Sequence, residues 1–329
     1  MFFKKTKNSF LIFLLTLFII PFNILAYSEY IVAGGENIGI RLNTDGIIIA
    51  GTYEINGINP AKEADLKEGD VIVSIDGTKV NSINDMVSII SKSETKKIKI
   101  KYNRDDSSKT TTLELVKDEN GYKTGLYVKD SVSGIGTLTF IDPKTKLFGA
   151  LGHEITDNNS GKIIEITDGE IFESKVTDVV PSRDGNPGEK NATLYTDLVE
   201  GEVFENTNKG IFGNYTDAID DSKLYKVAKI SDIKKGSAKI LTVLDGNAVK
   251  EYSINITKIS NTKDKVKNLV FEITDEELLS KTNGIIQGMS GSPIIQGDYI
   301  VGAVTHVVVD NPQKGYGILI TNMLEEAEN

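Results

Sequence analysis

The feature that most constrains this chain is a short run of glycine and serine near its C-terminal end, Gly288-Met289-Ser290-Gly291-Ser292-Pro293. A glycine two residues before a serine lets the chain turn tightly, so that both backbone N–H groups point to one side and can bind an oxyanion. The glycine after the serine keeps the turn free of a side chain, and the proline ends it before a strand. The run predicts that Ser290 is held on a tight turn.

A serine hydroxyl is a poor nucleophile unless a base removes its proton, and the chain has only two histidines, His153 and His306. His153 lies far upstream of Ser290, which suits a double β-barrel of the chymotrypsin type, where one barrel supplies the base and the other the nucleophile. His306 and its neighbour Thr305 lie on the apolar run after the turn, which we expect to line the substrate cleft. We therefore predict His153 as the base and keep His306 as the alternative.

The amino-acid composition excludes several classes of partner and of catalytic site. A net charge of −10 argues against a nucleic-acid partner. The absence of cysteine excludes disulfides, thiol catalysis and zinc–thiolate sites, and two distant histidines exclude a histidine-rich metal site. No Asp-x-Asp-x-Asp-Gly calcium loop occurs in the sequence. We expect neither a metal nor a cofactor.

The N-terminal residues 1–26 read as a targeting segment. Lys4, Lys5 and Lys7 precede an apolar run over residues 10–26, as in a secretory signal. A cleaved signal peptide and a retained membrane anchor are both compatible with this pattern, and in either case the rest of the chain is exported. We expect membrane contact only through this segment.

The remaining chain divides at a polar run over residues 118–121. Residues 34–117 alternate short apolar runs with two helical stretches, at 59–69 and 82–91. Residues 122–329 consist of short apolar runs separated by Gly, Asn, Asp and Pro, which is typical of a β-barrel or sandwich. The chain should therefore be mainly β, with an α+β domain followed by an all-β domain.

The first unit resembles the PDZ domains of bacterial proteases, on the strength of the Pro-Ala-x-x-Ala-x-Leu-x-x-Gly-Asp run over residues 60–70 and the strand and turn that follow. The resemblance implies a peptide ligand, in cis or in trans, whose C-terminus is capped by backbone N–H groups of a short loop. That loop would consist of Asn37, Ile38, Gly39 and Ile40.

The second unit resembles the SpoIVB peptidase family, the sporulation stage IV protein B proteases. The resemblance rests on four motifs, at residues 129–131 with 134–140, 148–153, 284–296, and 302–307 with 315–317. It implies a serine endopeptidase of the chymotrypsin-like double-barrel fold. In it, Ser290 is the nucleophile, His153 the base and Asp275 the acid, and the amides of Gly288 and Ser290 form the oxyanion hole.

The acid is the open question. Thr274 and Glu277 flank Asp275 in the pattern of a helix capping box, and an aspartate at a helix start needs no catalytic role. Asp197 is a rival, because it lies between His153 and Ser290 where a chymotrypsin-type acid would lie. Asn283 departs from the family, which usually carries glycine there, and Ser292 is expected only to support the turn.

The resemblance also implies a biological role. Such a protease would cleave a membrane-bound regulator in the space between the two membranes around a forespore and help to activate a mother-cell sigma factor. The short linker at residues 118–121 leads us to expect, in addition, that the PDZ and peptidase domains regulate one another through self-cleavage near the N-terminus. One alternative is a non-catalytic PDZ-based binding or signalling scaffold. Another, a quality-control protease, is disfavoured because such enzymes usually carry the PDZ domain after the protease domain.

Overall fold

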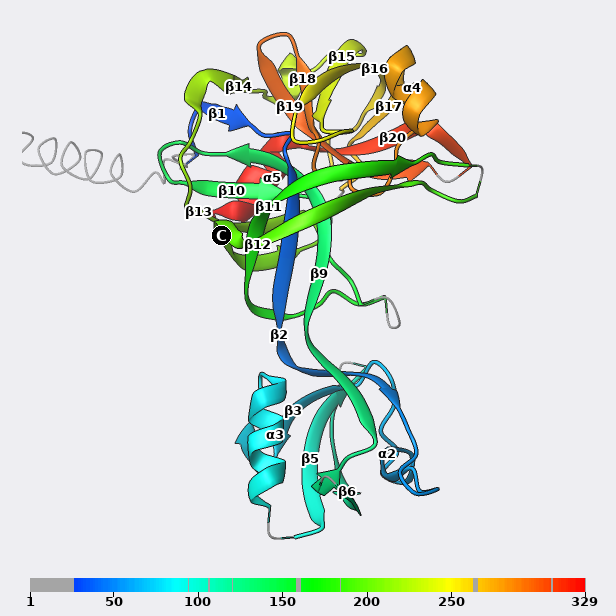
Figure 1. The fold of residues 1–329 in the computed structure, drawn as a ribbon. Helices are drawn as coiled ribbons and strands as arrows, with labels where there is room; N and C mark the ends of the chain where they lie inside the picture. Colours follow the sequence, from blue (N-terminus) through cyan, green and yellow to red (C-terminus); the bar gives the residue numbers. More distant parts are fainter. Residues whose placement is uncertain are drawn as a thin grey trace, which may run out of the picture.

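The computed structural model describes residues 27–328 except 94, 106, 120, 158–160, 184, 263–265 and 309. The predicted targeting segment, residues 1–26, lies outside the described residues. Within the described ranges, no helix is long and apolar enough to cross a membrane. Strands make up most of the molecule, as expected from the sequence, and form a large body with a smaller module below it (Figure 1).

Six strands of the body close into a first barrel. Each pairs antiparallel with the next around the ring β9–β2–β11–β12–β13–β10 and back to β9. A core of aliphatic and aromatic residues, including Ile38, Phe148 and Ile171, fills it. The bounds are β2 Asn37–Thr52, β9 Leu126–Ile141, β10 Leu147–Ala150, β11 Ile166–Val180, β12 Glu189–Thr207 and β13 Gly210–Tyr215.

A second ring of six strands closes the other barrel, in the order β15–β16–β17–β20–β19–β18 and back to β15. Its core is separate and includes Tyr252, Phe271 and Met289. The bounds are β15 Gly236–Thr242, β16 Lys250–Ile259, β17 Leu269–Ile273, β18 Pro293–Gln296, β19 Tyr299–Val308 and β20 Asn311–Leu319. The helix α4, Glu276–Thr282, lies between β17 and β18 in the chain.

Two short strands and a helix join the barrels. β1, Tyr30–Ala33, pairs with β9 of the first barrel and with β14, Leu224–Val227, which in turn pairs with β19 of the second. The C-terminal helix α5, Ile320–Ala327, buries Met323 and Leu324 in the same cluster as Phe140 of β9. The predicted double β-barrel is thus confirmed.

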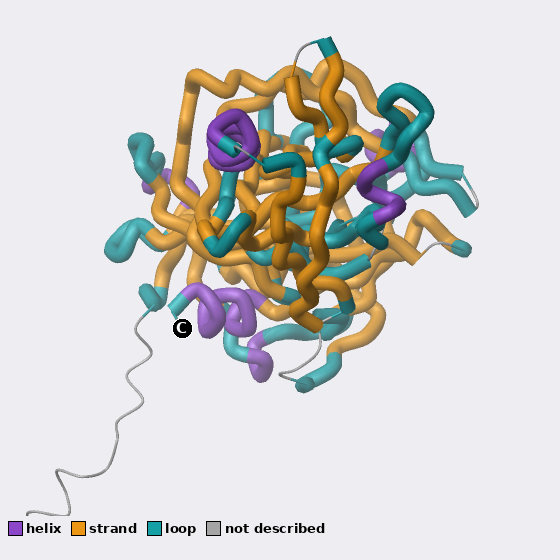
Figure 2. The backbone as a smooth tube through the Cα atoms, turned by 90° about the horizontal axis from the view of Figure 1, so that it is seen from below, coloured by secondary structure: helices purple, strands orange, loops and turns teal. Residues whose placement is uncertain are grey.

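The lower module has its own core and the expected α+β content. Figure 2, seen from below, looks almost along its main helix. The module contains α2 Pro60–Glu63, β3 Val71–Ile75, β4 Thr78–Lys79, α3 Ile83–Lys92, β5 Lys97–Arg104 and β6 Ser107–Glu114, followed by a hairpin of β7 Val116–Asp118 and β8 Gly121–Lys123. Ser82 caps α3 as predicted, in a capping box with Asp85.

This module is inserted into the first barrel rather than placed before it. The first part of β2, Asn37–Asn43, pairs with β9 on one side and with β11 on the other, both in the barrel. Only its second part, from Ile47, pairs with β3 of the lower module. The double-barrel body therefore begins before the lower module and continues after it.

The prediction that residues 37–40 form a PDZ carboxylate-binding loop is wrong. Asn37, Ile38, Gly39 and Ile40 form no loop, because they are buried strand residues of the first barrel. Strands pair with both of their edges, so no edge is left for a peptide. The repeating apolar pattern of residues 37–52 continues through both parts of one long strand.

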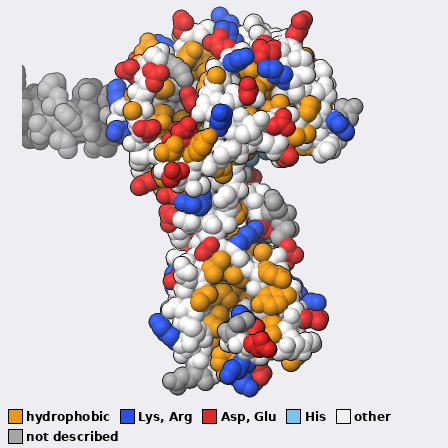
Figure 3. All heavy atoms as spheres, viewed as in Figure 1, with side chains coloured by type: hydrophobic (Ala, Val, Ile, Leu, Met, Phe, Trp, Pro, Cys, Tyr) orange, Lys and Arg blue, Asp and Glu red, His pale blue; other side chains and the backbone are white. Residues whose placement is uncertain are grey.

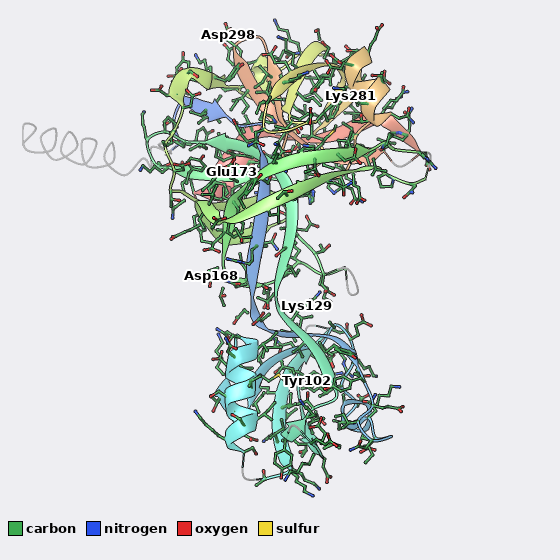
Figure 4. The ribbon with its side chains drawn as sticks, viewed as in Figure 1. Tyr102, Lys129, Asp168, Glu173, Lys281 and Asp298 are labelled. Carbon is green, nitrogen blue, oxygen red and sulfur yellow. The ribbon has the colours of Figure 1, made fainter. Side chains whose placement is uncertain are left out.

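β2 and β9 are the two chain segments that run from the body into the module, across a narrow waist (Figure 3). β2 bends at Gly46, which has φ +111° and lies so close to the carbonyl of Ile72 that a Cβ would clash at 2.7 Å. On β9, Lys129 lies at the waist (Figure 4) and bonds the Asp157 carboxylate at 2.9 Å. The next residue, Asp130, accepts a 2.8 Å bond from the amide of Ile83 at the start of α3.

Candidate active site

Ser290 lies on a tight turn between α4 and β18, as predicted. Gly288 has φ +90° and Gly291 has φ +95°, values that side-chain-bearing residues rarely adopt. A Cβ on Gly291 would lie 2.0 Å from the carbonyl oxygen of Thr137 and 2.6 Å from the amide of Leu151. Both glycines are therefore required by backbone geometry, and Gly291 lets the two barrels approach each other at the turn.

Two threonines of β9 hold this turn from the opposite barrel. The amide of Thr137 donates to the carbonyl of Ser290 at 3.0 Å, and its hydroxyl donates to the carbonyl of Gly288 at 2.7 Å. Thr139, likewise fully buried, donates to the carbonyl of Gly291 at 2.8 Å. These bonds fix the carbonyls of Gly288 and Ser290. The amides of the same two residues donate no hydrogen bond within the described part of the chain. They are available to an oxyanion.

The Ser290 hydroxyl donates to the carbonyl of Thr305 at 2.9 Å. That carbonyl is turned toward the serine by a β-bulge, because Val304 and His306 pair with consecutive residues of β20 and leave Thr305 between them unpaired. Bulges next to active sites commonly re-aim a group in this way. In this structure the nucleophile is therefore held in a resting orientation.

His153 follows two residues with positive φ, Leu151 at +67° and Gly152 at +70°. Such a value at a buried leucine is unusual and marks a strained turn. The Nδ1 atom of His153 lies 2.7 Å from the carbonyl oxygen of Glu154. Because a carbonyl can only accept, Nδ1 carries the proton and Nε2 keeps the lone pair that a general base needs.

Burial lowers the pKa of His153 below its ordinary value of 6.5, with the Glu154 carbonyl and carboxylate opposing this shift. The imidazole is therefore neutral at pH 7, which is the state required of a base. His153 and Ser290 line one cavity of about 320 Å³, so the structure brings the predicted base and nucleophile together. The cavity is otherwise lined by Ile40, Val132, Ser133, Gly134, Ile135, Leu151, Glu154, Ile155, Thr156, Gln287 and Gly288.

Both carboxylate oxygens of Asp275, the predicted acid, accept hydrogen bonds from backbone amides. One carboxylate oxygen accepts from the amide of Leu278 at 3.0 Å, as the N-cap of α4, and the other accepts from the amide of Ser253 at 3.1 Å. Among the described residues, the carboxylate that contributes to the pKa of His153 is that of Glu154, and Asp197 is exposed on β12. The orienting acceptor of His153 in this structure is the backbone carbonyl of Glu154.

The two predicted cleft residues lie next to the catalytic pair: Thr305 beside Ser290 and His306 beside His153. His306 stacks against His153, with ring centroids 5.1 Å apart and planes tilted by 43°. Burial and the neighbouring His153 lower the pKa of His306 to about 4, and its buried Nδ1 has no hydrogen-bond partner in the described part of the chain. Thr305 packs its methyl group near Gly152. Among the described residues that line the cavity, neither Thr305 nor His306 occurs.

Ser292 and Asn283 behave as supporting residues. Ser292 is fully buried beside the turn, so its hydroxyl is inaccessible to substrate. Asn283 ends α4 with φ +53°, a conformation that asparagine tolerates better than most residues and glycine best of all. The departure from the family's glycine is therefore conservative. Across the described ranges, no group of three or more acidic, histidine or cysteine side chains could hold a metal ion.

A serine and a neutral histidine on one cavity, two free amides beside the serine, and a pair of six-stranded barrels together define a trypsin-like serine peptidase. Comparison with protein families agrees with this class. Residues 120–324, more than half of the chain, match the SpoIVB peptidase S55 family, and residues 37–115 match the PDZ domain family. The chain belongs to the SpoIVB peptidase family.

Solved structures give weaker likenesses. The PDZ domain of the SdrC-like protein of Listeria monocytogenes is 27% identical, with a TM-score of 0.23, and the match covers 26% of this chain and 90% of that one. The active form of the Rv3671c protease of M. tuberculosis is 12% identical, with a TM-score of 0.30, over 60% of this chain and 74% of that one. The inactive form of the same protease is 13% identical, with a TM-score of 0.29, and the match covers 59% of this chain and 85% of that one. No curated protein matches the sequence.

Proposed function

We propose that this serine peptidase cleaves internal peptide bonds of a protein substrate by acyl transfer through Ser290. The observation that carries the proposal is the cavity shared by Ser290 and the neutral His153. The Ser290 hydroxyl leaves the Thr305 carbonyl, gives its proton to Nε2 of His153 and attacks the substrate carbonyl carbon. The amides of Gly288 and Ser290 stabilise the resulting oxyanion.

The histidine then returns its proton to the departing amine, and the peptide C–N bond breaks to leave an acyl-serine. A water molecule, deprotonated by His153, hydrolyses this ester and restores the serine. Throughout, the 2.7 Å contact with the Glu154 carbonyl holds the Nδ1 proton and stabilises the imidazolium form. This role, which an aspartate fills in the chymotrypsin arrangement, falls here to a backbone oxygen.

The cavity wall suits an extended peptide. Val132, Ser133, Gly134 and Ile135 of β9 line it, and β2 pairs with only one edge of this stretch. Among the described strands, none pairs with the other edge until Leu138, where β10 begins to pair. A substrate segment added at this edge would gain main-chain hydrogen bonds beside Ser290.

The biological proposal rests on the family. We propose that the protein is exported by its N-terminal segment and acts between the two membranes around a forespore. There it would cleave a membrane-associated regulator, and this cleavage would activate a mother-cell sigma factor. Self-cleavage near the N-terminus would release the protein from its N-terminal segment. A PDZ ligand, in cis or trans, would act on catalysis through β2 and β9, which are continuous from the module to the active site.

Sporulation efficiency tests this role. A strain that lacks the gene is complemented with the wild type, with Ser290→Ala and, as a matched control, with Ser292→Ala. We expect spores with the wild type and Ser292→Ala, and a loss of spores with Ser290→Ala. Full sporulation with Ser290→Ala would favour the non-catalytic scaffold, the alternative that the resting bond from Ser290 to Thr305 supports.

A further inference from the structure

A buried lysine lies directly behind the oxyanion-binding turn and takes no part in the chemistry above. Lys190, at the start of β12 in the first barrel, is only 3% exposed. Its ammonium group donates to the hydroxyl of Thr242 at 2.9 Å, at the fully buried end of β15 in the second barrel. The side chain therefore spans the junction of the two barrels.

The burial of this amine is costly. Burial lowers its pKa to about 7, and within the described part of the chain no charged group contributes to this shift. A buried amine without a carboxylate destabilises the fold relative to an apolar side chain of the same length. A residue retained under these conditions calls for a role that an apolar side chain would not fill.

The main chain of Lys190 bonds Gln287, the residue before Gly288, and its side chain lies against Gly288 itself. Its amide donates to the carbonyl of Gln287 at 3.0 Å, while the amide of Gln287 donates to the carbonyl of Gly188 at 2.7 Å. The side-chain stem lies against Gly288: a Cβ there would meet Cβ, Cγ and Cδ of Lys190 at 3.1–3.2 Å. The peptide unit that carries the Gly288 amide is thus fixed from behind by one residue.

We propose that Lys190 is a positioning residue for the oxyanion-binding amides, with its amine tied to Thr242 so that its stem holds Gly288 in place. The inference rests on the proposed function of the Gly288 and Ser290 amides. It predicts that loss of the amine or of its acceptor disturbs the transition state more than the binding of substrate. It also predicts that the backbone environment of Gly288 changes even without turnover.

Lys190→Met keeps the stem and removes the amine, Thr242→Val removes the acceptor with little change of shape, and Lys175→Met alters an exposed lysine of the neighbouring strand as a control. We expect both buried variants to lower kcat by about 10- to 100-fold, a fraction of the loss that follows removal of an oxyanion donor. KM should change by less than about 3-fold, because an interaction made only in the transition state contributes little to the binding of substrate. Lys175→Met should match the wild type, and thermal unfolding should show all three folded.

A kcat within about 2-fold of the wild type in folded Lys190→Met would overturn the proposal. If that variant does not fold, the same result in Thr242→Val overturns it. The ¹⁵N–¹H resonance of Gly288, followed in selectively glycine-labelled protein, separates this inference from the proposed function. A shift of that resonance in the buried variants supports the positioning role even if the wild type proves inactive, and an unmoved resonance contradicts it whatever the activity.

Discussion

The tight contact at Gly291 makes a quantitative prediction about the turn that carries the nucleophile. In Gly291→Ala, the new methyl group would lie 2.0 Å from the Thr137 carbonyl oxygen and 2.6 Å from the Leu151 amide, both of which are backbone atoms. The residue would also keep φ near +95°. Strained backbone costs about 1–3 kcal/mol and overpacking about 1–3 kcal/mol, so we expect a loss of about 2–6 kcal/mol in the free energy of unfolding.

Gly297 is a matched control in the turn that follows β18. It has φ +62°, and a Cβ there would meet nothing within 4 Å. Gly297→Ala should therefore lose only about 1–2 kcal/mol, from the backbone conformation alone. The comparison isolates the steric part of the effect, because both glycines have positive φ in loops that flank the same strand.

Urea denaturation followed by tyrosine fluorescence measures both variants, and labelling with a fluorophosphonate probe reports the state of Ser290. We expect Gly291→Ala to be much less stable than Gly297→Ala and to lose labelling, since any relief of the clash moves the serine away from His153. Equal stability of the two variants, with normal labelling of Gly291→Ala, would refute the packing argument.

Three further predictions follow from the site and the topology. Asp275→Ala should lower the free energy of unfolding by about 1 kcal/mol, as for a lost N-cap, and leave kcat within a few-fold of the wild type; a fall of about 10⁴-fold would restore Asp275 as the catalytic acid. His306 has a pKa of about 4 in the folded protein and near 6.5 in the unfolded chain, so between these pH values only the unfolded chain takes up the proton. The free energy of unfolding should therefore fall as the pH drops through this range. Urea titrations at pH 7.5 and pH 5 should show a smaller fall for His306→Gln than for the wild type, and an equal fall would contradict the lowered pKa of His306. Joining Thr44 to Asp130 through an Asn-Gly turn should leave a folded peptidase, since Asn43 and Ser131 already pair, whereas deletion of residues 34–117 should unfold it. Circular dichroism and fluorophosphonate labelling measure both variants. The opposite result would place the first part of β2 in the PDZ module.

Local sequence patterns were sufficient for the parts of the site that depend on local geometry. The turn around Ser290 could be predicted because its glycines are required by backbone conformation, and His153 because the chain offers so few bases. The cap of α3 was likewise visible in Ser82, whereas the pattern of Thr274 and Glu277 predicted a capping box for α4 and the structure caps that helix with Asp275 instead. At Asp275, however, an N-cap and a catalytic acid call for the same residue type, and only the contacts separate the two roles.

The features that could not be predicted depend on pairing between distant segments. Residues 37–52 follow one apolar pattern, so nothing local marks the point where β2 leaves the barrel for the PDZ module. Thr137 and Thr139 alternate with apolar residues as they would on any half-buried strand, and their bonds reach a turn in the other barrel. Lys190 lies between the exposed Glu189 and Asn191 in the sequence, and its contact with Thr242 of the second barrel is one between distant segments.

The most direct test of the catalytic assignment is fluorophosphonate labelling of purified residues 27–329 at pH 7.5, comparing the wild type with Ser290→Ala, His153→Ala, Ser292→Ala and Asp275→Asn. We expect labelling of the wild type, Ser292→Ala and Asp275→Asn, and loss of labelling in Ser290→Ala and His153→Ala. Labelling that survives Ser290→Ala, or that disappears in Ser292→Ala while the protein stays folded, would contradict it.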